Sequence, residues 1–386
     1  MREDESAAFS RVVSRRNALK WMGVAVGGTA LGACTPLTRS AAPPVRGRRR
    51  LAPVRVSEER VIRTVVGLRP FRRSGFLVQA QSQNQRLLIH NYGHGGGGVS
   101  LSWGSADLAA ELALASSDRQ AAVVGCGVIG LSTARLLQDR GFLVTIYARD
   151  LPPNTTSNIA GAQWSPVTVV DADQATPAFE AQFVRASRFA NRYFQTLVSA
   201  RYGISWRENY SISTHVTTAP SGGSWEASHL RDLLIRTDLS PEESPFPTYR
   251  VSHFLSMHIE PSIYLPAVLQ DFRIAGGRVV IRDFADARSI LALPEPVIAN
   301  CTGLAAGKLF DDADVLPIKG QLTVLAPQPE VDYITVGPGD LYMMPRQDGI
   351  ILGGTHERGE WSLEPNATEA ARILRGQQEL FASLVS

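Results

Sequence analysis

Residues 121–130, with the sequence AAVVGCGVIG, combine a short apolar run with a GxGxxG pattern. The pattern predicts a strand over residues 121–124, a glycine-rich turn, and a helix over residues 128–140 that Gly141 ends. A second strand is expected over residues 143–147. In this context the glycines allow a pyrophosphate to approach the backbone, and the N–H groups at the helix start attract its charge. The sequence therefore predicts a dinucleotide site at Gly125, Gly127, Val128, Ile129 and Gly130.

The composition is that of a globular enzyme with little net charge. The chain has 386 residues and a formal charge of +3, which falls to +1 when residues 1–33, with five basic and three acidic side chains, are set aside. A nearly neutral body gives no electrostatic argument for binding nucleic acid. The cysteines Cys34, Cys126 and Cys301 lack the spacing of a metal site or a disulfide framework, so no metal is expected.

The N-terminus has the features of an export signal. Residues 14–20, SRRNALK, form a twin-arginine pattern, and the apolar run over residues 21–32 is shorter than the roughly 20 residues that span a bilayer. Residues 31–34, LGAC, resemble a bacterial lipobox. We therefore expect residues 1–34 to be a signal peptide and Cys34 to carry a lipid.

A membrane tether is expected after the signal. Residues 35–60 are rich in Pro, Ala and Arg and have no apolar periodicity, which predicts a disordered segment. The expected location is then the periplasmic face of a bacterial membrane, held there by the lipid. An uncleaved hydrophobic N-terminal tail is the alternative.

Residues 90–104, HNYGHGGGGVSLSWG, stand about 30 residues before the GxGxxG pattern. This stretch resembles the signature near the C-terminus of D-amino-acid oxidases, a family whose chains open with GxGxxG. The motifs are in reverse order here, so the chain resembles a circularly permuted member of that family. The resemblance implies an α/β fold, in which a Rossmann-like FAD-binding domain is interwoven with a mixed or antiparallel β-sheet substrate domain.

The reversed order also predicts where the pieces meet. Residues 61–116 would be the transposed C-terminal part of the oxidase fold, and residues 121–386 would begin with the FAD-binding strand. The link over residues 116–120 has an ordinary length for a loop between helix and strand. Residues 367–385 resemble the helix that precedes the arginine-bearing strand in the family, and that strand begins here at Val61. Such a rearrangement is tolerated where chain ends lie close together at the surface.

The resemblance assigns three residues to a substrate. Arg69, in the sequence GLRP, matches the arginine that binds the substrate carboxylate; its planar guanidinium can form two charge-assisted bonds and stays charged when buried. Tyr342 matches a tyrosine that hydrogen-bonds the same carboxylate, and the Gly96 carbonyl would accept a bond from the substrate amine. The second active-site tyrosine of mammalian members is absent, since residues 337–339 are GPG, which predicts a more open pocket. Residues 350–361 resemble a GGxxxxGxW hairpin of the family.

The cofactor implied by the resemblance is FAD. Thr156 and Ser157 would approach the pyrophosphate, and residues 160–163 would pass beneath the isoalloxazine. The glycine run over residues 95–98, before a helix over residues 106–115, would meet the pyrimidine edge of the flavin. The residues assigned to FAD beyond the first turn are Arg149, Asp150, Thr156, Ser157, Gly161, Ala162, Gln163, Phe284, Thr302, Gly95, Gly96, Gly97, Gly98, Val99 and Ser100.

One of these assignments departs from the mammalian pattern, and two others match the family at the ends of further strands. Arg149 stands where mammalian-type members carry an acidic residue, and would address the adenylate phosphate or ribose, with Asp150 as a turn residue. Phe284 and Thr302 would follow strands expected over residues 279–281 and 297–300, which would extend the first sheet.

The reaction that the resemblance implies is oxidative deamination of D-amino acids with oxygen as electron acceptor. Glycine, sarcosine or another secondary amine is an alternative substrate, and a membrane quinone an alternative acceptor. A non-catalytic flavin-binding lipoprotein and an oxidoreductase that uses only a nicotinamide are two further alternatives. The seven histidines form no evident base–nucleophile pair, and His90 and His94 are expected to order their loop rather than to act in catalysis.

Overall fold

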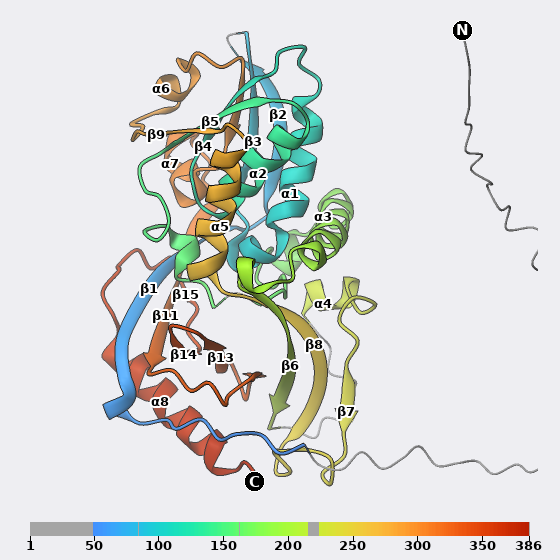
Figure 1. The fold of residues 1–386 in the computed structure, drawn as a ribbon, viewed down its shortest axis with the longest axis vertical. Helices are drawn as coiled ribbons and strands as arrows, with labels where there is room; N and C mark the ends of the chain where they lie inside the picture. Colours follow the sequence, from blue (N-terminus) through green and yellow to red (C-terminus); the bar gives the residue numbers. More distant parts are fainter. Residues whose placement is uncertain (1–48, 84, 162, 215–223, 386) are drawn as a thin grey trace, which may run out of the picture. The chain divides into compact units, whose positions relative to one another are not determined.

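The computed structural model of the chain describes residues 49–83, 85–161, 163–214 and 224–385. Within this part, two β-sheets with helices around them form the two halves of the molecule in Figure 1. The strand orders are β2-β3-β10-β4-β5-β9 in a six-stranded sheet and β1-β11-β14-β13-β12-β6-β8-β7 in a nine-stranded sheet, in which β15 also pairs with β11. The α/β fold with mixed sheets is therefore confirmed.

The six-stranded sheet contains the GxGxxG segment. All its strand pairs are parallel except the hairpin of β2 and β3. The predicted strands over residues 279–281 and 297–300 lie in it, as expected. Its strands are β2 (Leu77–Gln83), β3 (Arg86–Tyr92), β4 (Gln120–Val124), β5 (Leu143–Ala148), β9 (Arg278–Ile281) and β10 (Val297–Asn300).

The nine-stranded sheet is mixed and includes the first strand of the chain. β1 pairs with β11 in antiparallel fashion from Val61 to Arg72, so residues far apart in the sequence share this edge. Its strands are β1 (Val61–Arg72), β6 (Ile204–Ser213), β7 (Thr237–Leu239), β8 (Arg250–Ile259), β11 (Val315–Leu325), β12 (Tyr333–Val336), β13 (Tyr342–Arg346), β14 (Gly349–Gly353) and β15 (Glu357–Arg358).

Helices cover both sheets, and some of them start with a side-chain cap. The Thr176 side chain accepts a bond from Phe179 N at the start of α3, and the Asn366 side chain accepts bonds from Thr368 N and Glu369 N at the start of α8. Helix α8 packs its apolar side chains against one face of the nine-stranded sheet. The helices are α1 (Gly98–Ala113), α2 (Val128–Asp139), α3 (Pro177–Thr196), α4 (Trp225–His229), α5 (Pro261–Ile274), α6 (Ala287–Leu291), α7 (Ala306–Leu309) and α8 (Ala367–Ala382).

The expected tether is wrong over its last residues. Leu51 and Val54 are only 5% and 4% exposed and belong to the core beneath α8. Tyr333 donates a hydrogen bond of 2.7 Å to the carbonyl of Ala52, and the short helix η1 (Glu58–Arg60) leads into β1. The composition misled because two buried apolar side chains are enough to fix an extended, polar segment against the sheet. The folded part therefore begins well before residue 60.

The expected helix over residues 106–115 is also wrong at both ends. A short 3₁₀ helix, η2 (Gly95–Gly97), leads directly into α1, which begins at Gly98 and ends at Ala113. Glycine disfavours helix, so local propensity hides this start. Burial of Ser100, Leu101 and Ser102 inside the fold supplies the stabilisation that propensity lacks.

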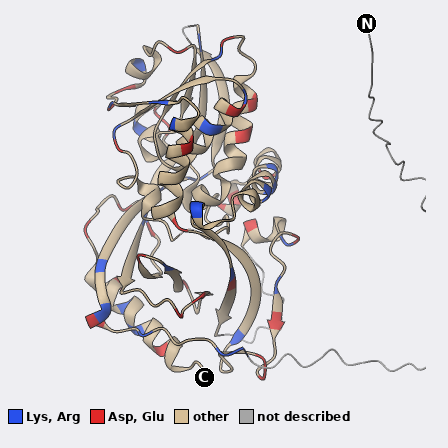
Figure 2. Ribbon diagram, in the orientation of Figure 1, with Lys and Arg blue, Asp and Glu red and all other residues tan. Residues whose placement is uncertain are grey.

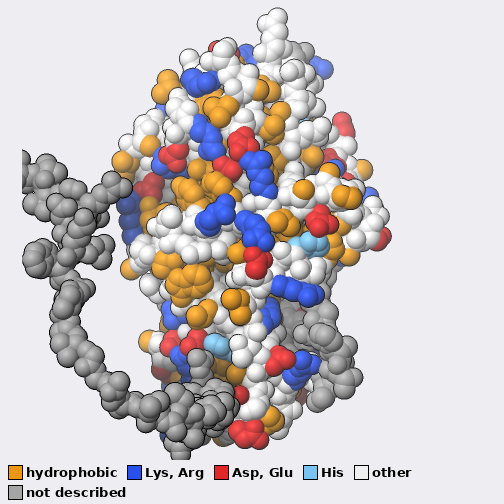
Figure 3. All heavy atoms as spheres, turned by 90° about the vertical axis from the view of Figure 1, so that its right-hand side faces the viewer, with side chains coloured by type: hydrophobic (Ala, Val, Ile, Leu, Met, Phe, Trp, Pro, Cys, Tyr) orange, Lys and Arg blue, Asp and Glu red, His pale blue; other side chains and the backbone are white. Residues whose placement is uncertain are grey.

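Several features of the sequence lie outside the described residues: the twin-arginine signal, Cys34, the tether up to residue 48, and Ala162. Within the described part, no helix is long and apolar enough to cross a membrane. Charged residues of both signs are scattered over both halves (Figure 2), and hydrophobic and charged side chains are intermixed on the face in Figure 3.

Candidate active site and cofactor cradle

The glycine-rich turn after β4 can be built only from glycine at two positions. Gly125 has φ +113°, and a Cβ there would lie 2.4 Å from the carbonyl oxygen of Cys301. A Cβ on Gly130 would lie 2.1 Å from the carbonyl oxygen of Gly125. Backbone atoms fill both places, so the turn closes tightly against the end of β10.

The space before the start of α2 is different, because it is open. A Cβ on Gly127 would meet only the hydroxyl of Ser157, at 3.1 Å. Leu131 N makes the first intrahelical bond, to Gly127 O, so the N–H groups of the first turn point out of the helix end. Val128 N donates to Ser157 Oγ at 3.0 Å. The structure thus brings the predicted residues Gly127, Val128, Ile129 and Ser157 together, with Thr156 beside them in η3 (Thr156–Asn158).

The other residues assigned to this end of the cofactor follow neighbouring strands of the same sheet. Arg149 and Asp150 follow β5 and form an ion pair of 2.8 Å with each other. The Asp150 carboxylate raises the pKa of Arg149. Phe284 follows β9 and packs edge-on against Tyr147, and Thr302 follows β10. The carboxyl ends of adjacent parallel strands form one edge, where ligands bind in such sheets.

The glycine run rests on a segment that the sequence did not single out. Gly95 has φ +54°, and a Cβ there would lie 2.2 Å from the carbonyl oxygen of Thr168. Gly96 N donates to the same oxygen at 3.0 Å. A Cβ on Gly97 would lie 2.4 Å from the Val169 side chain, whereas Gly98 has no such neighbour. Segment 165–169 therefore dictates glycine at three of these positions.

The first turn of α1, Gly98, Val99 and Ser100, also touches that segment. The Ser100 hydroxyl donates to Gln163 O and accepts from Ser165 N, both at 3.0 Å. The Gln163 side chain donates to the carboxamide oxygen of Asn209 on β6, and both are buried. Gln163 thus links the start of α1 to the nine-stranded sheet, and Asn209 is a neighbour that the sequence did not indicate.

Arg69 and Tyr342 lie close together on the face of the nine-stranded sheet that carries Gly320 and Gly353. A Cβ on Gly320 would lie 2.6 Å from the Arg69 guanidinium, and one on Gly353 would lie 2.1 Å from the Tyr342 ring. Arg69 donates to the Thr355 carbonyl at 3.2 Å. Burial raises the pKa of Tyr342, and the neighbouring Arg69 opposes this rise. The hydroxyl is therefore protonated and able to donate at neutral pH.

These two glycines were missed because their role depends on register. Gly320 pairs with Gly67 on β1, and Gly353 pairs with both Leu322 and Tyr342. Because Gly320 and Gly353 have no side chains, the Arg69 guanidinium can lie across β11 and the Tyr342 ring across β14. The GGxxxxGxW pattern contains Gly353, but Gly320 stands in no motif.

Two chains of contacts connect the Arg69 region to the cradle. A Cβ on Gly303, beside Thr302, would meet Pro70 at 3.8 Å. Four residues after Ser157, a Cβ on Gly161 would meet the Met344 sulfur at 3.0 Å and the Tyr342 ring at 3.5 Å. The residues next to Arg69 and Tyr342 thus lie close to the segments that follow Cys301 and Ser157, which border the cradle.

A family model described as FAD dependent oxidoreductase matches residues 18–112 and 120–386. The chain belongs to this family of FAD dependent oxidoreductases. FAD is therefore its cofactor, in agreement with the cofactor expected from the sequence.

Relatives and solved structures agree with this membership. The chain is 31% identical over 265 residues to a D-amino-acid oxidase of Rubrobacter xylanophilus, with 66% of this chain and 75% of the relative covered. It is 30% identical over 259 residues to the D-aspartate oxidase of Homo sapiens, with 66% and 73% covered. The fold resembles that of a glycine oxidase from Bacillus cereus, at a TM-score of 0.51, 16% identity, and 67% and 77% coverage. An iminodiacetate oxidase from Chelativorans sp. BNC1 gives a TM-score of 0.52, 14% identity, and 68% and 79% coverage.

The residues of this FAD dependent oxidoreductase fit such a cofactor. Both α1 and α2 begin after a glycine that offers no side-chain cap. In α2 the Val128 N–H donates to Ser157 Oγ, and the next N–H groups face the space before the helix. The open space before Gly127 suits the pyrophosphate, and Gly95–Gly97 would bring main chain close to the flavin ring.

The two histidines of the glycine-run motif have structural surroundings. His90 Nδ1 is 3.0 Å from the side-chain nitrogen of Asn300, and the His94 ring stacks on Phe76 with centroids 4.7 Å apart. Burial lowers the pKa of both, to about 3 for His94. These surroundings suit the ordering role predicted for them. In the described part of the chain, no group of three His, Cys, Asp or Glu side chains could hold a metal ion.

Proposed function

We propose that the protein oxidises D-amino acids to 2-oxo acids and ammonia, with oxygen reduced to hydrogen peroxide. The observation that carries the proposal is the Arg69 guanidinium beside the Tyr342 hydroxyl, connected to the cradle through Pro70 and Gly161. A fixed cation with a neutral donor is the arrangement that a carboxylate requires. The relatives named D-amino-acid oxidase support a D-amino acid as the molecule that carries this carboxylate.

Each residue has a defined task in this reaction. Arg69 binds the substrate carboxylate, with its orientation fixed by the Thr355 carbonyl. Tyr342 donates to the same carboxylate, and the Gly96 carbonyl accepts from the substrate amine. The Gly96 N–H donates a hydrogen bond to the Thr168 carbonyl, and this bond holds the peptide in place. Orientation replaces acid–base catalysis here, because three contacts fix the Cα–H bond.

The reaction transfers two electrons from the amino acid to oxygen. Bound FAD supplies the acceptor for the hydride that leaves Cα. The amine loses a proton, and water hydrolyses the resulting imino acid to the 2-oxo acid and ammonia. Two electrons and two protons then reduce one oxygen molecule to hydrogen peroxide.

The experiment is a substrate panel on purified, flavin-loaded protein. D- and L-amino acids, D-aspartate, glycine and sarcosine are supplied in air while hydrogen peroxide is measured, and without air while flavin absorbance is followed. Peroxide from D-amino acids and none from their L-enantiomers supports the proposal. Bleaching without peroxide would indicate a dehydrogenase, activity only on glycine or sarcosine a secondary-amine oxidase, and no bleaching a non-catalytic flavoprotein.

A variant of Arg69 tests the role of the guanidinium. Arg69→Ala should retain flavin and lower kcat/KM about a hundredfold or more, since removing one partner of a buried charge pair costs about 2–5 kcal/mol. Arg63→Ala is the matched control, because Arg63 is exposed on the same strand and pairs with half-buried Asp348. Equal kinetics for Arg69→Ala and the unaltered protein would contradict the assignment.

We also infer that the chain is a circular permutation of its relatives. Gln378 on α8 donates to the Val56 carbonyl at 3.2 Å, so the last helix lies beside the segment that leads into β1. The relatives match about two thirds of this chain, which is the size of residues 121–386. A rearranged chain that runs from residue 120 to 385 and continues through a linker into residues 49–119 should fold and bind FAD. A flavin-free or insoluble product would contradict the inference.

We further propose export by the twin-arginine route and lipidation at Cys34, from the SRRNALK and LGAC sequences. Cys34→Ala should move the protein from the membrane to the soluble fraction. Unchanged fractionation would remove the lipid from the proposal.

A further inference from the structure

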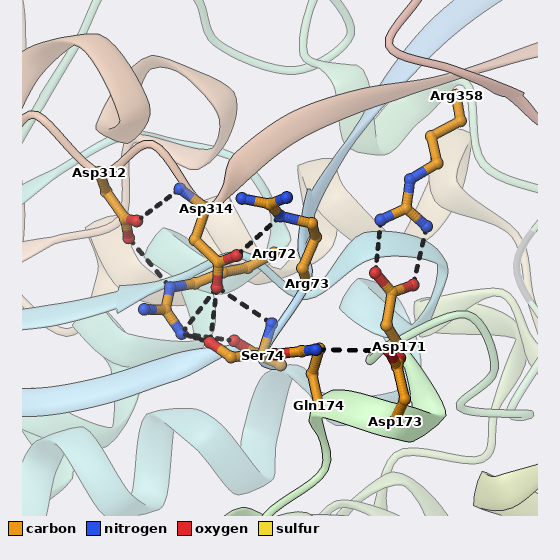
Figure 4. A network of polar contacts seen from close by, with 10 residues as sticks. Arg72, Arg73, Ser74, Asp171, Asp173, Gln174, Asp312, Asp314 and Arg358 are labelled. Carbon is orange, nitrogen blue, oxygen red and sulfur yellow. Dashed lines mark hydrogen bonds and ion pairs between the residues drawn. The ribbon is translucent and has the colours of Figure 1, made fainter.

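A pair of charged residues joins two segments that meet only in the folded protein. Arg358 on β15 donates to both carboxylate oxygens of Asp171, at 2.7 and 2.5 Å, as Figure 4 shows. This two-point geometry fixes the relative orientation of the side chains as well as their distance. The pair lies outside the residues assigned to substrate or cofactor.

The Asp171 end belongs to the segment that carries the glycine run. Thr168, three residues earlier, accepts the bond from Gly96 N and has φ +56°, a conformation that a β-branched residue adopts only when its surroundings impose it. Asp171 N donates to the Arg73 carbonyl at 2.8 Å. Asp171 therefore helps to fix the position of the segment whose Thr168 carbonyl binds the Gly96 N–H.

The Arg358 end belongs to segment 354–359, which leads from β14 into β15 along β11 and orients Arg69. Thr355, which accepts the bond from Arg69, lies three residues before Arg358. The Arg358 guanidinium also lies over the Phe71 ring, 4.9 Å from its centroid. A Cβ on Gly95 would lie 2.8 Å from this same ring. Phe71, on the strand that carries Arg69, therefore lies between the Arg358 guanidinium and the base of the glycine run.

The nearby charges have partners of their own. Arg73 pairs with Asp314 at 3.0 Å, and Arg72 pairs with Asp312 at 2.9 Å. Among the residues drawn, the Asp171–Arg358 pair is therefore the direct ionic link between segment 165–171 and segment 354–359.

We propose that Asp171 and Arg358 are positioning residues that set the distance between the group binding the substrate carboxylate and the group binding its amine. This inference rests on the proposed function, since it assigns those groups to Arg69 and Gly96. Neither residue of the pair touches the substrate. Breaking the pair loosens the spacing without removing either contact, so substrate binding weakens more than turnover.

The test compares Asp171→Asn, Arg358→Gln and the double variant with the unaltered holoenzyme. For a partly exposed pair, KM should rise about three- to fivefold, kcat should change less than twofold, and the double variant should behave like either single one. Arg358→Lys keeps the charge but loses the fork, so it should recover only part of the effect. The matched control is the Arg188–Asp232 pair, also bonded at two points, at 2.7 and 3.1 Å, but between α3 and a surface turn.

A second readout does not depend on turnover. In Arg358→Gln, amide hydrogen exchange of a peptide covering residues 94–100 should become faster, with thermal unfolding little changed. Unchanged exchange and KM, or the same changes in Arg188→Gln, would overturn the proposal. If the unaltered enzyme oxidised no D-amino acid, the proposed function would fail, and the exchange of this peptide would still decide whether the pair couples the two segments.

Discussion

Two glycine-rich turns each lead into a helix, and they obtain their shape in different ways. The turn before α2 is shaped by the sheet it belongs to: Gly130 packs on Gly125 of the same turn, and Gly125 packs on the end of adjacent β10. The turn before α1 is shaped by remote residues, since Gly95, Gly96 and Gly97 pack on Thr168 and Val169. The first can therefore be predicted from a local pattern, whereas the second needs a partner that no local pattern names.

Gly130→Ala should have the largest effect on either turn. The new Cβ would lie 2.1 Å from a backbone oxygen, which cannot rotate away. We expect flavin content below about one tenth of normal and an unfolding free energy lower by about 3 kcal/mol. The ratio of flavin to protein absorbance measures the first and urea unfolding the second. A variant with full flavin content would show that the turn tolerates a side chain.

Gly97→Ala should have a smaller effect that a remote substitution repairs. Its Cβ would lie 2.4 Å from a Val169 side-chain carbon, so the loss should be about 2 kcal/mol. Because the obstacle is a side chain, Val169→Ala in the same protein should recover at least half of the loss. No second substitution can relieve Gly130→Ala in this way, because the obstacle there is the backbone carbonyl of Gly125. If the losses of the two single variants simply add in urea unfolding of the double variant, contact with Val169 is not the reason that this position requires glycine.

Acid should destabilise the second turn more than the first. Burial lowers the pKa of His94 to about 3, below its ordinary value of 6.5. The folded protein therefore keeps this imidazole neutral, while the unfolded chain takes up a proton below pH 6.5. Stability present above that pH is lost as the pH falls toward 3, by up to about 1.4 kcal/mol per pH unit. Cys126 in the first turn, with a pKa of about 12, does not titrate there.

His94→Gln checks this contribution. His258, with a pKa of about 3 from burial, adds a similar dependence of its own, so the variant should lose part of the slope between pH 6.5 and 4.5. Urea unfolding at several pH values measures it. Identical slopes for the two proteins would mean that His94 takes up its proton at the same pH in the folded protein as in the unfolded chain.

Gly98→Ala should have the smallest effect and the opposite sign. Its φ is −54°, and the nearest atom to a new Cβ would be His94 Cβ at 3.7 Å. Alanine there should stabilise the protein by about 0.4–1 kcal/mol, because it restricts the unfolded chain. A loss of stability in thermal unfolding would show that all four glycines of the run are required.

The same distinction explains what the sequence could predict. The strand–turn–helix around Gly125 and the strands at residues 279–281 and 297–300 follow from local patterns, and all are present. Family resemblance indicated Arg69 and Tyr342, which do lie together. Gly320, Gly353 and Thr168 could not be inferred, because their importance arises from cross-strand register and from a contact between distant segments. The start of α1 and the packing of Leu51 and Val54 were mispredicted for the same reason: burial overrode local composition.

Residues 61–92 run first through β1 of the larger sheet and then through β2 and β3 of the smaller one. One continuous segment of the chain thus contributes strands to both sheets. Neither layer should melt alone, and calorimetry of the folded body should record one cooperative transition. If the chain were cut between β1 and β2 and the two pieces were expressed separately, the larger sheet would lose its edge strand β1. We therefore expect this oxidoreductase to fold as one unit.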